Sequence, residues 1–153
     1  MTQSKQQGLF SLLIWGLAGL GFIITFFSGG GPSTFAQESI RILISAICLL
    51  FGFAGFGIML YLTKTKSGNS PVIEDERDSQ IALQASQTGF VTVLVYVFLT
   101  CIILWESFRG ENAVPLGWMW FLAYSTGIVG YLSHAITMLI LNMRMEIHGE
   151  SCD

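Results

Sequence analysis

Four long apolar runs alternate with short polar connections along the chain. The runs cover residues 9–27, 40–62, 88–105 and 116–143, and the connections between them carry glycine or proline, which interrupt helices. A helix needs about 20 apolar residues to cross the hydrocarbon core of a bilayer. The pattern therefore predicts an all-α integral membrane protein with four transmembrane helices, forming a single domain over residues 1–153.

A polar segment before the third run is also predicted to be helical. Ser70 and Pro71 are residue types that suit the N-cap and the first position of a helix. Several glutamines before residue 88 make the segment too polar for the bilayer core. We therefore expect a cytoplasmic loop and helical stalk over residues 63–87, so that the third helix extends into the cytoplasm.

Composition supports the membrane assignment. Hydrophobic residues make up 52% of the chain and charged residues 11%, against about 25% charged residues in soluble domains. The net charge of −3 argues against a nucleic-acid partner, which requires a basic surface. The three cysteines, Cys48, Cys101 and Cys152, share no spacing typical of a metal site. Composition thus indicates the lipid bilayer as a partner.

Basic residues near the span ends predict the orientation, because Lys and Arg favour the cytoplasmic side. An N-terminus inside the cell puts Arg41 and Arg109 outside. The cytoplasmic set is then larger and comprises Lys5, Lys64, Lys66, Arg77 and Arg144. The same orientation places the outer tryptophans, Trp105, Trp118 and Trp120, at the headgroup level where amphipathic rings settle. We therefore predict that both termini are cytoplasmic.

The predicted stalk contains a dense group of charges. Glu74, Asp75, Glu76, Arg77 and Asp78 are consecutive, and the acids suit the positive end of a helix dipole. Two interpretations stay open: the charges form a partner-binding surface, or they keep a solvated stalk in water. A stripe of small residues that would allow another helix to approach follows at helical spacing: Ser79, Ala82, Ser86 and Gly89.

The element Asp75-Glu76-Arg77-Asp78, followed by a mixed helix into the third of four spans, resembles a group of small prokaryotic membrane proteins classed as a domain of unknown function. The resemblance covers roughly residues 40–143. It implies a multi-pass protein of a bacterial or archaeal inner membrane. It implies no reaction and no catalytic residue.

His134 is an ionisable residue well inside a predicted span, and such residues are functional candidates because their burial in lipid is costly. Gly127 and Gly130 share its helix face, so small residues open a groove toward the imidazole. One interpretation is a haem or metal ligand or a proton relay, and a bis-histidine haem would need its second ligand from another subunit. Four residues of the same span lie nearby and could satisfy the imidazole: Tyr124, Tyr131, Ser133 and Thr137. The other interpretation is a neutral histidine hydrogen-bonded across a helix interface.

Small-residue faces also indicate helix packing. Gly52 and Gly55 lie on one face of the second span, and Gly127 and Gly130 on one face of the fourth. The predicted spans contain no Asp or Glu, and the sequence has no phosphate-binding glycine loop, HExxH or GxSxG motif. The sequence therefore favours a role without catalysis.

Three function classes follow from these features. The first is a partner-binding accessory or regulatory subunit, forming a homo-oligomer or joining another membrane protein through the charged helix. The second is a small oligomeric transporter or channel. The third is a redox protein that binds haem through His134; the other two predict no cofactor. The polar residues that could line a pore are Thr88, Thr92, Thr100 and Ser125.

Overall fold

The computed structural model describes residues 3–66, 76–111 and 113–149, with side chains for residues 5–32, 34–61, 79–111 and 113–145. Long helices account for most of this: α1 (Gln3–Phe27), α3 (Ser39–Lys66), α4 (Glu76–Ser107) and α5 (Leu116–Gly149). A short helix, α2 (Pro32–Phe35), lies between α1 and α3 and begins with a proline, which suits the first turn.

Each long helix contains a segment that is long and apolar enough to cross a membrane. The segments are Lys5–Phe27, Ser39–Tyr61, Ser79–Ser107 and Leu116–Met145. The prediction of an all-α protein with four transmembrane helices is confirmed. The third segment begins at Ser79, well before the predicted residue 88, because α4 continues without a break through its glutamines.

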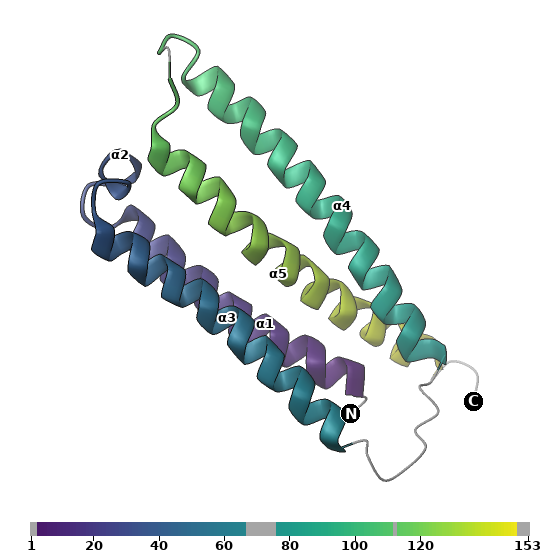
Figure 1. Cartoon of the computed structure of the whole chain (residues 1–153). Helices are drawn as coiled ribbons and strands as arrows, with labels where there is room; N and C mark the ends of the chain where they lie inside the picture. The colour runs from purple at the N-terminus through teal and green to yellow at the C-terminus, as the bar shows by residue number, and fades with distance from the viewer. Residues whose placement is uncertain (1–2, 67–75, 112, 150–153) are drawn as a thin grey trace.

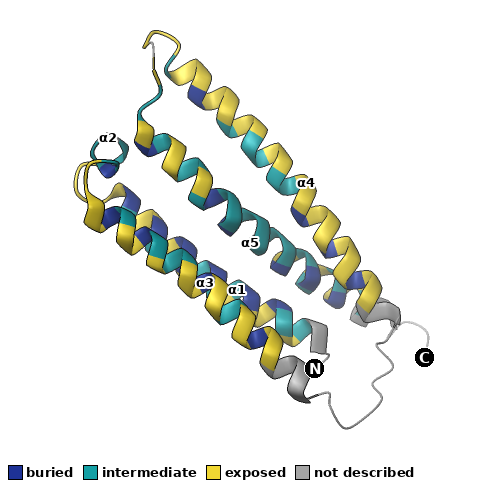
Figure 2. Cartoon of the chain, viewed as in Figure 1, coloured by how far each residue is buried: buried dark blue, intermediate teal, exposed yellow. Residues whose placement is uncertain are grey.

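The helices pack in the spatial order α3, α1, α5, α4 (Figure 1). α5 lies centrally, with α1 on one side and α4 on the other, and α4 packs mainly on α5. The start of α1 and the end of α5 lie at the same end of the molecule, as four crossings require (Figure 1). α4 is the least buried span, with 11% of its apolar segment buried, and most of its surface is exposed (Figure 2).

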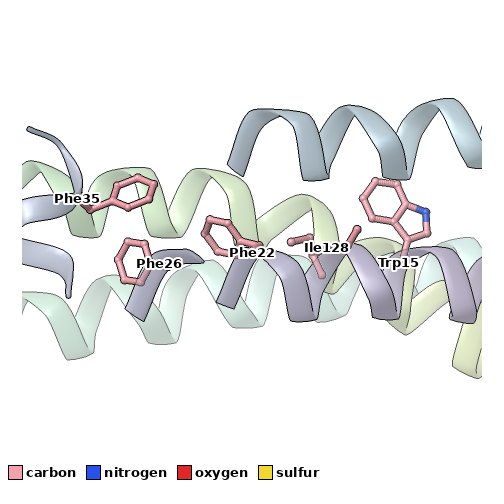
Figure 3. Packing of buried hydrophobic residues seen from close by; sticks show 6 residues of the cluster. Trp15, Phe22, Phe26, Phe35 and Ile128 are labelled. Atoms are coloured by element: carbon pink, nitrogen blue, oxygen red, sulfur yellow. The ribbon is translucent and has the colours of Figure 1, made fainter. Parts of the chain in front are cut away.

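The core follows α1, where Trp15, Phe22 and Phe26 are buried (Figure 3). Trp15 stacks on Tyr131 of α5, with ring centroids 4.3 Å apart. Phe26 packs on Phe35 of α2 at a centroid distance of 4.9 Å. Large rings bury much area and prefer defined mutual geometries, so this aromatic row fixes α1 against α2 and α5.

The turn after α1 depends on glycines and on one arginine. Residues Gly29 to Gly31 all have positive φ, which side chains of L-residues rarely allow. Arg41, buried at the start of α3, donates hydrogen bonds to the carbonyl oxygens of Thr25 and Phe26. These carbonyls belong to the last turn of α1, where helical partners run out, so the guanidinium caps α1.

The first part of α4, which the sequence analysis assigned to a helical stalk, packs against α5. Ile81 and Ala85 are fully buried and form a cluster with Met138 of α5. α5 has 34 residues, or about 50 Å at 1.5 Å per residue, so it is long enough to pack along this first part of α4 as well. Gly89 is the buried member of the predicted small-residue stripe, whereas its other members are exposed: Ser79, Ala82 and Ser86.

Candidate functional site

A groove of about 480 Å³ lies between α3 and α4, with α5 contributing much of its lining. His134, Gly127 and Gly130 all line it, so the fourth-span face predicted from the sequence borders one cavity. A Cβ atom on Gly127 would meet nothing within 4 Å, whereas one on Gly130 would lie 2.9 Å from Cγ2 of Val93. Gly127 therefore widens the groove, and Gly130 lets α4 approach α5.

His134 lies about 24 Å along α5 from Trp118, at 1.5 Å per residue. The imidazole is partly buried in the groove. Within the described part of the chain it makes no hydrogen bond, either to Tyr131 or to the other partners expected from the sequence. The described residues therefore show no hydrogen bond to His134 either within α5 or from a neighbouring helix.

No metal centre surrounds this histidine among the described residues, where no three His, Cys, Asp or Glu side chains come together. His148, the second histidine, lies at the end of α5 and its side chain is outside the described set. A haem held by two histidines would therefore need a ligand from a second chain, as the sequence also indicated.

A second groove, of about 340 Å³, is lined by residues of α1, α4 and α5. Its polar groups are paired with each other. The hydroxyl oxygens of Tyr96 and Ser125 are 2.6 Å apart, and Ser125 donates to the carbonyl oxygen of Phe121 at 2.6 Å. Because a serine hydroxyl has one proton, Tyr96 is the donor to Ser125. This pair joins α4 to α5 across the groove.

The glycines of the second span lie against α1. A Cβ atom on Gly52 would be 2.9 Å from the indole ring of Trp15, and one on Gly55 would be 3.3 Å from Ile14. Such distances are shorter than ordinary van der Waals contacts, so both positions have room only for glycine, which lacks a side chain. Small residues thus set the approach of α3 to α1, as is usual between membrane helices.

The four hydroxyl-bearing residues that could line a pore do not line one common cavity within the described chain. Thr88, Thr92 and Thr100 each donate to the carbonyl oxygen one turn earlier in α4. Ser125 lines the second groove, and none of the threonines lines either groove. Each hydroxyl therefore satisfies its own helix, which is how such groups are accommodated in lipid.

The charged cluster is described only in part. Glu74 and Asp75 lie outside the described residues. Glu76, Arg77 and Asp78 form the first described turn of α4, and their side chains are outside the described set. The partner-binding role of these five residues remains a prediction.

Two residues that join helices to one another escaped the sequence analysis: Arg41 and Tyr96. Arg41 was assigned only to the outer edge of the second span, although an arginine that opens an apolar run after three glycines signals capping of backbone carbonyls. Tyr96 pairs with Ser125 from another helix, and no spacing in the sequence relates the two. Both depend on how helices are arranged in space.

A protein-family model described as a predicted membrane protein (DUF2178) matches residues 8–145. The chain belongs to this family. The match covers most of the chain and reaches all four spans, in agreement with the resemblance to an uncharacterised membrane family. No curated protein and no solved structure matches the chain. Family membership thus establishes a multi-pass membrane protein and supplies no activity.

Proposed function

We propose that this protein is a non-enzymatic accessory or regulatory subunit of a bacterial or archaeal inner membrane, and that α4 contacts its partner. The supporting observation is a continuous exposed stripe on α4 whose members alternate by steps of four and three residues. We call it the α4 stripe: Gln80, Gln84, Gln87, Val91, Leu94, Phe98, Cys101 and Trp105. This heptad spacing is the pattern through which two helices pack at a small left-handed crossing angle.

The occupant that fits the α4 stripe best is a second copy of this chain. A two-fold axis along the membrane normal brings the same stripe of two copies together in parallel. The glutamines at one end are self-complementary, because each amide both donates and accepts. Interhelical side-chain hydrogen bonds contribute only about 0.6 kcal/mol each on average in membranes, so the glutamines set the register while apolar packing supplies most of the affinity.

The dimer also gives the charged segment a use. In the sequence, residues 74–78 directly precede the α4 stripe. Pairing of two α4 helices therefore presents two copies of this segment at one membrane face. Charge complementarity acts mainly on specificity and association rate, which suits a surface that selects a regulatory partner.

Cys101 provides the test because it is exposed in the α4 stripe. Oxidation of native membranes with copper phenanthroline should link two copies through Cys101, since a disulfide requires Cα atoms about 4.4–6.8 Å apart. The experiment uses the Cys152→Ser variant, which removes the tail thiol. Adding Cys101→Ser is the negative control, and the partly buried Cys48 stays in both proteins.

The mass of the adduct identifies the occupant. A band at twice the chain mass supports the second copy. An adduct of another mass would show that a different membrane protein contacts the α4 stripe. The accessory role would then stand, with that protein as the partner. If Cys101 reacts with a lipid-soluble maleimide but forms no adduct with any protein, lipid covers the stripe and the proposal is wrong.

A further inference from the structure

We propose that the groove around His134 binds a planar, uncharged membrane molecule that carries a carbonyl oxygen and an apolar tail, which is the chemistry of a membrane quinone. The site belongs to the single chain and is independent of pairing through the α4 stripe. Three properties of the groove support this choice of ligand: its unpaired polar groups, its shape and its charge.

Two polar side chains from different helices line the groove. His134 of α5 and Ser86 of α4 both line it, and neither side chain makes a hydrogen bond within the described part of the chain. His134 is partly buried in a mostly apolar groove, where a polar group without a partner costs free energy, so a ligand that pairs with the imidazole gains affinity. An imidazole N–H and a serine hydroxyl both donate to a carbonyl oxygen.

The shape favours a flat ring. The open space above Gly127 leaves a bare stretch of α5 backbone as one wall of the groove. Aromatic side chains from three different helices lie around the same cavity, and aromatic faces stack on planar rings. These side chains are Phe56 of α3, Phe90 of α4 and Tyr131 of α5.

The charge of the groove lining favours a quinone over a phospholipid headgroup as the ligand. Among the residues that the structure describes, the groove lining contains no Lys or Arg, and so none of them offers a countercharge for a phosphate. The second groove is a useful contrast, because the hydroxyls of Tyr96 and Ser125 already bond each other there. The His134 groove therefore combines unpaired donors with an aromatic, uncharged wall.

The test is photolabelling of the full chain in phosphatidylcholine nanodiscs with an azidobenzoquinone that carries a decyl tail. Labels should map to residues 86–93 and 126–134, and excess unlabelled decylbenzoquinone should compete them away. His134→Leu should weaken binding roughly tenfold, as expected for loss of one hydrogen bond, whereas His134→Gln should retain most of it because the amide keeps a donor. If excess unlabelled decylbenzoquinone does not reduce the labelling of the wild-type protein, the proposal is wrong.

Two glycines provide a matched pair of blocking variants. Gly127 lines the His134 groove and Gly16 lines the second groove, and a Cβ atom on either would meet nothing within 4 Å. Gly127→Leu should abolish the labelling, and Gly16→Leu should leave it intact. Loss of labelling with Gly16→Leu but not with Gly127→Leu would contradict the site. Equal labelling of the same residues by phosphatidylcholine with a photoreactive acyl chain would also contradict it, because ordinary lipid would then fill the groove.

Discussion

The Nη2 atom of Arg41 donates a 2.6 Å hydrogen bond to the carbonyl oxygen of Phe26. The same guanidinium also bonds the hydroxyl of Thr34 at 3.0 Å and lies over the ring of Phe35, at 5.4 Å from its centroid. A single side chain thus ties the end of α1 to α2 and to the start of α3. Its charge is turned inward and bonded to protein oxygens, which is how membrane proteins accommodate a buried arginine.

Arg41→Met should lower the stability of the protein by about 2–3 kcal/mol, because carbonyl groups in a buried turn lose a charged donor. Thermal unfolding in detergent, followed by circular dichroism, measures the effect. Arg109→Met is the matched control, since Arg109 is exposed and its ion pair with Glu106 contributes little. Equal melting temperatures for the two variants would show that the Arg41 bonds do not hold the turn.

Gly52→Ala should destabilise the packing of α3 on α1. The added methyl group would lie 2.9 Å from the Trp15 ring, and overpacking of this kind costs about 1–3 kcal/mol. Gly57→Ala is the control in the same helix, because a Cβ atom there meets nothing within 4 Å. The control should be neutral or slightly stabilising, since alanine favours helix over glycine. Thermal unfolding of both variants makes the comparison.

Reporter fusions at residues 66 and 153 should both give cytoplasmic signals. Lys5 and Arg144 lie at one end of the molecule, near the start of α1 and the end of α5, while Arg41 and Arg109 lie at the other end (Figure 1). The first end also carries Lys64 and Lys66 at the end of α3 and Arg77 at the start of α4, and the end richer in basic residues is expected to face the cytoplasm. A periplasmic signal at both fusion points would reverse the orientation, and opposite signals at the two points would contradict four crossings.

Charge reversal by Asp75→Lys with Asp78→Lys should remove proteins that co-purify with the wild type, while expression and helicity stay nearly unchanged. The reason is that exposed charges contribute little to stability and much to the choice of partner. Glu106→Lys with Glu111→Lys is the matched control, because it makes the same charge change at the opposite end of α4 and in the connection that follows it. If both double variants keep every partner, the cluster is a solvated stalk.

The four spans could be predicted from the sequence because the bilayer fixes how many apolar residues a helix needs. The groove could be predicted in part, since Gly127, Gly130 and His134 share one helix face at regular spacing. A regular spacing identifies the residues on a face and leaves open which neighbour that face meets. The contact between His134 and Gly89 of α4 is an example, because it depends on where α4 lies.

The buried face of α4 shows more clearly what the sequence alone cannot predict. Ser79, Ala82 and Ser86 are small, yet they are exposed, whereas Ile81 and Ala85 are buried against α5. Packing between helices depends on the match of two surfaces, and a sequence displays only one of them at a time. Arg41 illustrates the same point, since the carbonyls that it caps belong to a different helix.

The spatial order of the helices constrains how the protein is made. α5 is synthesised last, yet it lies between α1 and α4 and is the main neighbour of α4. At roughly 5–20 residues per second, the ribosome needs on the order of several seconds to complete α5 after α4 has emerged. During that interval α1 and α3 can pair, but α4 waits in the bilayer or the insertion machinery without its partner. A chain truncated before α5 would therefore lack the surface against which α4 mainly packs.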